Sequence, residues 1–325
     1  MDYVKTSRLS EYESEENRWL WEPYIAQGTV SLMAGLGGKG KSFLSLAIAA
    51  AVTKGLPLPG NDTAHLPPSN VFLKNSENHL KRMIRPRADI VGADLDRIIL
   101  LNEEGLSLTD DRLERLIVQD KIALALIDPL QAHLPRGVSM NNAESIRPVF
   151  THLSGVAERT NCAIVLVGHV NKGNSASSDR LLGSADIFNS VLSVMLVGKI
   201  DVAEGISAMV HHKSNMDELG SSQAFRLSKR NGFDWLGECN ATASDVLREN
   251  DSCADSIIES NPDGKLNETA EMLLALLSDG PRPSSEVYDI IVNNHGVSKS
   301  TFNRAKADLG IKSYHDGVPW MMKLE

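Results

Sequence analysis

The stretch that most constrains this chain is GLGGKGKS, residues 35–42, which fits the pattern G-x-x-x-x-G-K-[ST]. It follows the apolar run GTVSLMAG, which predicts a β-strand, and precedes SFLSLAIAAAVTKG, which predicts a helix ending at Gly55. Glycines at these positions let successive backbone N–H groups turn toward a phosphate at the N-terminus of the helix. A flexible glycine turn that matches by chance is the alternative, but the place between strand and helix favours a phosphate-binding loop.

This loop predicts a chemical role for each of its residues. Lys41 is expected to reach the β- and γ-phosphates, and the Ser42 hydroxyl is expected to ligate Mg²⁺. The other predicted nucleotide-binding residues belong to the loop or follow it directly: Gly35, Gly37, Gly38, Lys39, Gly40 and Phe43. The loop alone predicts a site for ATP or GTP with Mg²⁺.

Two acidic residues at predicted strand ends extend this site. Asp128 ends the apolar run IALALID and is predicted to be the second metal ligand, because a buried carboxylate is costly unless it faces a ligand or partner. An aspartate that begins a turn before Pro129 is the alternative. Glu77 ends NVFLKNSE, the first predicted strand after the phosphate-loop helix, and is a candidate for positioning the attacking water.

The order of apolar runs predicts an α/β core with a mainly parallel sheet. RIILLN, IALALIDPL and CAIVLVGHV are predicted strands, and DDRLERLIVQD is a predicted helix with Thr109 as its N-cap. A second, longer helix is predicted from six apolar residues at helical spacing: Ile146, Val149, Phe150, Leu153, Val156 and Ala157. Four further runs between residues 190 and 237 predict consecutive antiparallel strands.

Composition limits the classes of protein that remain. The chain has 325 residues, 42% of them hydrophobic, which supports a large core, and a net charge of −9, which argues against a broad grip on nucleic acid. Its three cysteines lie far apart and form neither a metal-binding nor a disulfide pattern. With no predicted membrane span and a polar N-terminal segment, residues 1–18, we expect a cytoplasmic protein.

Together these residues resemble the RecA-like ATPases, in particular the hexameric replicative DNA helicases typified by plasmid RepA proteins and related AAA-family ATPases of phages and mobile elements. The resemblance covers residues 19–237 and includes NHLKRMIRPR after Glu77 and the Asp-Pro-Leu that ends the predicted strand IALALIDPL. It implies that Glu77 is the catalytic base, that Asp128 is the metal-site acid and that His169, in VLVGHVNK, senses the γ-phosphate. It also implies that Lys172 and Arg180 lie in a loop facing a central channel that holds single-stranded DNA.

The same resemblance implies a basic residue that acts on the neighbouring subunit's nucleotide. MVHHKSNMDELG is similar to the family's hairpin, and Lys213 matches its lysine. Many relatives carry an arginine two residues later, where this chain has Asn215. Lys213 or Arg226 is the candidate for this role, and both are also compatible with ordinary solvated strand charges.

The last sixty residues predict a separate unit after an acidic linker at 238–264. Residues 265–325 resemble a winged helix-turn-helix, in which a third helix, SKSTFNRAKADLG, carries Lys299, Arg304 and Lys306 toward DNA. From Asn261 onward the segment has seven basic and nine acidic residues, so a role in protein contacts is the alternative.

These observations predict an ATP-hydrolysing, ring-forming DNA helicase or translocase that replicates a plasmid, phage or mobile element, with a hexamer favoured and replication proteins as further partners. One alternative is a RecA-like ATPase that acts in recombination or repair without unwinding. The other is an ATP-regulated DNA-binding regulator.

Overall fold

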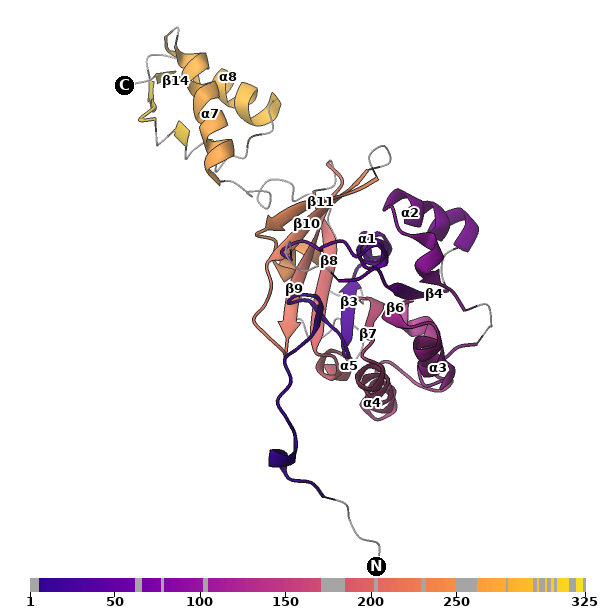
Figure 1. Ribbon diagram of the computed structural model, residues 1–325. Coiled ribbons are helices and arrows are strands. Elements are labelled where there is room, and N and C mark those ends of the chain that lie inside the picture. The colour runs from indigo at the N-terminus through magenta and orange to yellow at the C-terminus, as the bar shows by residue number, and fades with distance from the viewer. Residues whose placement is uncertain are drawn as a thin grey trace, which may run out of the picture.

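A nine-stranded mixed sheet forms the centre of the molecule (Figure 1). The computed structural model describes residues 6–61, 66–76, 79–101, 105–170, 185–201, 204–228, 232–248, 262–278, 280–294, 297, 302, 305–306, 309–315 and 320–323. Within these residues the strand order is β11-β10-β9-β8-β3-β7-β6-β4-β5. The strands from β8 to β5 run parallel to one another. The predicted α/β core with a mainly parallel sheet is confirmed.

The strands of this sheet fall into two groups. The parallel group is β3 (Val30–Gly35), β4 (Asn70–Asn75), β5 (Ile98–Ile99), β6 (Ile122–Asp128), β7 (Ala163–His169) and β8 (Ser193–Asp201). The predicted antiparallel extension is also present, as β9 (Ile206–Ser214), β10 (Ser222–Ser228) and β11 (Gly232–Cys239). The predicted strand RIILLN is reduced to two residues at the edge of the sheet, where β4 is its only partner among the described strands.

Helices cover both faces of the sheet, which explains why its central strands are apolar at almost every position. α1 (Lys41–Lys54) and α2 (Arg85–Ile90) lie on one face, and α3 (Arg112–Gln119), α4 (Ala143–Thr160) and α5 (Ala185–Ser190) lie on the other (Figure 1). Successive side chains of a strand point to opposite faces. Leu126 of β6 therefore packs in the cluster with α1, and Ile127 packs in the cluster with α4. The six apolar residues predicted for α4 are all buried.

Short elements connect and flank these layers. A small hairpin of β1 (Trp19–Trp21) and β2 (Ile25–Ala26), which the sequence analysis did not predict, packs its aromatic side chains into the α1 face. Single helical turns before the C-terminal part are η1 (Leu9–Glu11), which is exposed in the N-terminal segment, η2 (Leu80–Ile84), η3 (Leu95–Arg97) and η4 (Leu130–His133). Among the helices of the described ranges, none has the length and apolar character needed to cross a lipid bilayer.

The predicted N-cap of α3 is wrong. The helix begins at Arg112, and the Asp110 carboxylate accepts the Arg112 backbone N–H at 2.9 Å. The Thr109 hydroxyl contacts Ser107 Oγ at 3.3 Å instead. The N-cap residue is Asp111, whose side chain makes no cap hydrogen bond. Asp110, which precedes it, also binds the Arg112 guanidinium at 2.6 Å, so its carboxylate and not the threonine satisfies the first backbone N–H of the helix.

The predicted linker also begins too early, because residues 238–248 pack against the core. β11 continues to Cys239, and the short helix α6 (Ala243–Val246) starts at a capping box in which Thr242 and Asp245 bind each other's backbone N–H. Val246 is fully buried, and a Cβ on Gly198 of β8 would lie only 1.9 Å from its carbonyl oxygen. Residues 249–261 of the predicted linker lie outside the described residues.

The C-terminal part has a hydrophobic core of its own. Its elements are α7 (Pro262–Leu277), α8 (Ser284–Tyr288), the π-helical turn η6 (Asp289–Asn294) and a small sheet of β12 (Arg282–Pro283), β13 (Lys312–His315) and β14 (Trp320–Lys323). Leu273, Leu277, Val287 and Ile291 are buried in this core. The predicted third helix lies mostly outside the described residues, so the winged helix-turn-helix stays a prediction.

Candidate nucleotide site

The loop Gly35–Ser42 joins the end of β3 to the start of α1 and has the backbone that its glycines allow. Gly38 and Gly40 have φ values of +72° and +100°, which side chains other than hydrogen rarely permit. Gly40 is the N-cap of α1, and a Cβ there would lie 2.9 Å from Leu227 of β10. Gly35 is tighter still, since its Cβ would lie 2.1 Å from the Val197 carbonyl oxygen. The glycines therefore serve both the turn and its packing against the antiparallel strands.

Lys41 is held inside this loop, with 4% of its surface exposed. Its ammonium donates to the carbonyl oxygens of Gly35 and Leu36, each at 2.8 Å, and lies 3.3 Å from Nδ1 of His169. An ammonium can only donate, so Nδ1 of His169 is the acceptor in this contact. The predicted phosphate-binding lysine and the predicted sensor histidine therefore lie in direct contact.

Ser42 and Asp128 form the second half of the site. The Ser42 hydroxyl donates to Asp128 Oδ2 at 2.8 Å, and Asn75 Nδ2 lies 3.4 Å from the same oxygen. Asp128 is 4% exposed and stands at the carboxyl end of β6, two strands from β3. Parallel strands place such ends at one edge, which is how residues far apart in sequence meet. A hydroxyl and a carboxylate in contact are oxygen donors of the kind that Mg²⁺ prefers, so this pair fits the predicted metal site.

A cavity of about 400 Å³ opens above these residues. Its walls include the loop residues from Gly38 to Phe43, together with Asp128 and His169, whereas Gly35 and Gly37 of the predicted set are not among the lining residues. Two further cations, which were not predicted from the sequence, line the cavity: Arg87 of α2 and Lys199 of β8. Arg87 lies over the Phe43 ring at 5.0 Å. A lysine inside the apolar run SVLSVMLVGKI was the available signal for Lys199, since a charge in a buried strand needs a polar neighbour.

The antiparallel strands close one side of the cavity. Ser207, near the start of β9, donates to the Lys39 carbonyl oxygen at 3.5 Å, and Leu227 of β10 lines the cavity. The Phe225 ring on the same strand packs close to Gly40. The phosphate-binding loop is therefore in contact with the sheet extension as well as with the parallel core.

Lys213 lies at the other end of β9, away from the loop of its own chain. β9 runs antiparallel to β8, with Val194 opposite Lys213 and Asp201 opposite Ile206. The Lys213 ammonium donates to the carbonyl oxygens of Phe188 and Val191 at 2.8 Å, beyond the last turn of α5, and burial lowers the pKa of this lysine. A cation there stabilises the end of the helix.

Arg226, the other candidate for a role on the neighbouring subunit, stands opposite Ile206 and thus at the end of β9 next to its own loop. Several predicted site residues lie outside the described residues: Glu77, Lys172, Arg180, Lys299 and Arg304. Ser76, which precedes Glu77, is described, and its backbone N–H donates to the Asp128 carbonyl oxygen at 3.2 Å. Lys306 is a half-buried residue of the C-terminal part, apart from the nucleotide site.

A family model described as an AAA domain matches residues 1–175, more than half of the chain and the part that holds the loop, Asp128 and His169. The chain belongs to this AAA-domain family. Membership implies that this AAA domain binds nucleotide. No curated protein matches the chain.

Two solved structures are similar to this AAA domain. One is the crystal structure of the RadB recombinase, with 15% identity, a TM-score of 0.47 and coverage of 64% of this chain and 91% of that one. The other is the ATPase domain of G40P, with 12% identity, a TM-score of 0.49 and coverage of 65% and 85%.

Proposed function

We propose that this AAA domain is a RecA-like, Mg²⁺-dependent ATPase that drives a ring-forming DNA helicase or translocase. The observation that carries the ATPase is the contact of Ser42 Oγ with the Asp128 carboxylate, beside Lys41 and His169 at the mouth of one cavity. A triphosphate with its metal carries phosphate oxygens and a divalent cation. The cavity offers cations and backbone N–H groups to the phosphate oxygens, and it offers oxygen ligands to the divalent cation.

Each residue of the site has a separate role in the proposed hydrolysis. Lys41 and the loop N–H groups stabilise negative charge on the phosphates, and Ser42 with Asp128 holds the metal, which neutralises charge and orients the phosphates when bound. In this proposal Glu77 positions the attacking water, and His169 senses the γ-phosphate from its contact with Lys41. Lys213 is the leading candidate for acting on the pocket of a neighbouring subunit, because it lies at the end of β9 remote from its own loop.

The DNA-moving part of the proposal rests on the resemblance to RepA-type hexameric helicases and on the predicted basic positions. Lys172 and Arg180 repeat in every subunit of a ring, so a few cations per chain give a charged channel despite the acidic net charge. Lys299, Arg304 and Lys306 of the C-terminal part are proposed to contact DNA or a DNA-bound partner, and residues 265–325 to fold as a winged helix.

The test combines ATP hydrolysis, with and without single-stranded DNA, and unwinding of a forked duplex. We expect DNA to stimulate hydrolysis and expect Asp128→Asn and Glu77→Gln to reduce it by about 10²-fold or more. Glu158→Gln, an exposed position on α4, is the matched control and should leave the rate unchanged. Normal hydrolysis by Glu77→Gln would refute the base assignment. DNA-stimulated hydrolysis without unwinding would favour the recombination or repair ATPase instead.

A further inference from the structure

The carboxylate of Asp128 is held by the end of the neighbouring strand as well as by its own. Asn75, the last residue of β4, pairs with Asp128 in the sheet and places its amide 3.4 Å from Oδ2. The next residue, Ser76, continues the pairing, since its N–H donates to the Asp128 carbonyl oxygen at 3.2 Å. Whatever fixes Ser76 therefore fixes the position of Asp128.

A buried histidine fixes Ser76. His133 ends η4, five residues after Asp128, and is 5% exposed. Its Nε2 lies 3.0 Å from the Ser76 hydroxyl, and its Nδ1 lies 3.4 Å from the Leu106 carbonyl oxygen. Burial lowers the pKa of His133 and outweighs the opposing effect of the contact with the Leu106 carbonyl oxygen, so the neutral ring is the species at neutral pH.

The two contacts determine which nitrogen carries the proton. A carbonyl oxygen only accepts, so Nδ1 donates to Leu106, and the neutral ring is left with a lone pair on Nε2. The Ser76 hydroxyl must then donate to Nε2. His133 is thus an acceptor aimed at the residue that borders the metal-site aspartate.

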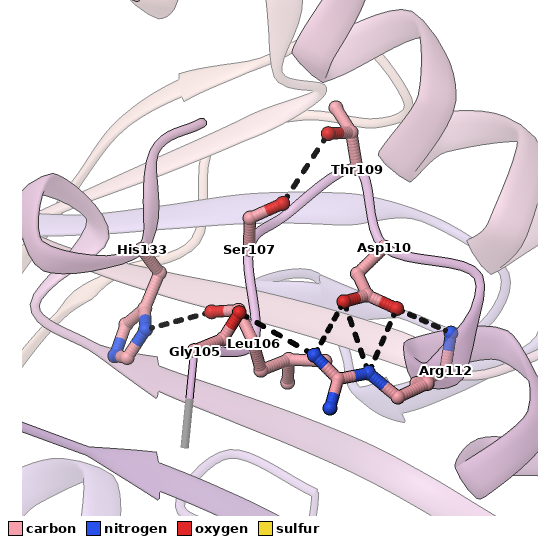
Figure 2. A network of polar contacts seen from close by, with 7 residues as sticks. All are labelled: Gly105, Leu106, Ser107, Thr109, Asp110, Arg112 and His133. Atoms are coloured by element: carbon pink, nitrogen blue, oxygen red, sulfur yellow. Dashed lines mark hydrogen bonds and ion pairs between the residues drawn. The ribbon is translucent and has the colours of Figure 1, made fainter. Parts of the chain in front are cut away.

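The other partner of His133 is itself anchored, as Figure 2 shows. Leu106 is buried in the main core, and the next buried residue, Leu108, donates its N–H to the His133 carbonyl oxygen at 2.8 Å. Arg112 reaches back to the Gly105 carbonyl oxygen at 3.4 Å while bound to Asp110. The segment 105–112 is therefore a fixed support against which the imidazole is set.

We propose that His133 is a positioning residue for the magnesium site of this AAA domain: through Ser76 it holds the end of β4 against Asp128. This inference rests on the proposed function for its metal. Because the contact of His133 with Ser76 fixes the position of the metal ligand Asp128, losing that contact should weaken Mg²⁺-dependent nucleotide binding.

Two substitutions of His133 test the roles of its two ring nitrogens separately. His133→Gln keeps an amide near the place of Nε2, where its oxygen can accept from Ser76, and loses the Nδ1 donor. His133→Asn keeps an amide near the place of Nδ1, where it can donate to Leu106, and loses the acceptor. Ser76→Ala removes the same contact from the other side. His152→Asn, a half-buried position on α4, is the matched control for the loss of an imidazole.

The primary measurement is the Mg²⁺ concentration that gives half-maximal binding of a fluorescent, slowly hydrolysed ATP analogue, together with thermal unfolding of the full chain. We expect His133→Asn and Ser76→Ala each to raise that concentration about five- to tenfold, the scale of one lost hydrogen bond, and the double variant to raise it no further. His133→Gln and His152→Asn should stay near wild type.

The outcomes distinguish this inference from the proposed function. Equal effects of His133→Asn and His133→Gln, or effects that follow thermal stability alone, would show a purely structural histidine and overturn the inference. Additive effects of His133→Asn and Ser76→Ala would also overturn it. Wild type that binds the analogue with Mg²⁺ but does not hydrolyse ATP would refute the proposed ATPase while leaving the metal-dependence test of His133 intact.

Discussion

At the scale of single residues, the loop glycines differ in what they are needed for. Gly40 combines a φ of +100° with the close approach of Leu227 and Phe225, whereas a Cβ on Gly37 would meet nothing within 4 Å. The pattern G-x-x-x-x-G-K-[ST] requires glycine at position 40 and allows any residue at position 37, and the structure gives the steric reason for that difference.

Gly40→Ala should lower the free energy of unfolding by about 1–3 kcal/mol, because the new methyl group meets both an unfavourable φ and a side chain. Gly37→Ala, the matched control, should change it by less than about 1 kcal/mol, since neither its φ nor its surroundings oppose a methyl group. Urea unfolding without nucleotide measures both. Equal destabilisation by the two substitutions would contradict this account.

A second residue-scale feature is the buried imidazole of His211 on β9. Gly220 N–H donates to its Nδ1 at 2.9 Å, and Nε2 lies 3.1 Å from Ser193 Oγ. Burial lowers the pKa of His211 to about 4. The imidazolium form would lose the contact with Gly220, because both ring nitrogens would then donate.

This pKa predicts a stability that falls with acid. Between pH 6.5 and about 4 the unfolded chain binds a proton at this site that the folded chain does not, so lowering the pH favours unfolding, by about 2 kcal/mol between pH 7.5 and 5. His133 and His212, whose pKa values burial also lowers, act in the same direction. Urea unfolding at both pH values should therefore show a smaller loss for His211→Gln than for wild type, and an identical loss would contradict the assignment.

At the scale of elements, sequence patterns predicted the helices and strands of the core well because each has an apolar face of sufficient length. Strand order could not be read from the chain, since it depends on which edges pair, and that order is what brings Ser42 to Asp128. The hairpin of β1 and β2 was missed because two or three residues give no periodicity. The linker was placed too early because the few apolar residues at 241–247, among them the buried Ala241 and Val246, are too short a set to show a periodic pattern in a polar stretch.

Tyr24, a buried residue of that hairpin, forms hydrogen bonds to the sheet extension. Tyr24 Oη donates to the Ser221 carbonyl oxygen at 2.6 Å and accepts from Gln223 Nε2 at 3.0 Å. Tyr24→Phe should lower the free energy of unfolding by about 1–3 kcal/mol, because it leaves buried polar groups without their partner. Tyr12→Phe, at a residue 66% exposed, should change it by less than about 0.5 kcal/mol. Thermal and urea unfolding measure both, and a neutral Tyr24→Phe would show that packing alone holds the hairpin.

At the scale of the whole molecule, the proposed ring requires each active pocket to be shared between two chains. Lys41 belongs to one side of such a pocket, and Lys213 is the candidate from the other. Lys41→Ala and Lys213→Gln should each be inactive as pure proteins. Glutamine is chosen because its amide can still donate to the carbonyl oxygens of Phe188 and Val191.

An equal mixture of the two variants should regain activity. With random assembly about a quarter of the interfaces would pair an intact Lys41 with an intact Lys213, so the rate should approach about a quarter of wild type. Steady-state hydrolysis after mixing, with chain exchange checked by light scattering, measures this. A mixture no more active than its components would show that Lys213 is not the basic residue that acts on the neighbouring subunit's nucleotide, and Arg226 would be the next candidate.

β9 links two places that the proposed mechanism keeps in different pockets. Ser207 at one end contacts the Lys39 carbonyl oxygen, and Lys213 lies six residues along, about 20 Å away at the usual strand rise. A strand paired on both sides resists stretching, so a shift of the phosphate-binding loop would be transmitted along β9 as a displacement of Lys213. In a ring, a change at the nucleotide of one subunit would then alter the position of Lys213 in the pocket of its neighbour, and hydrolysis in adjacent subunits would be coupled.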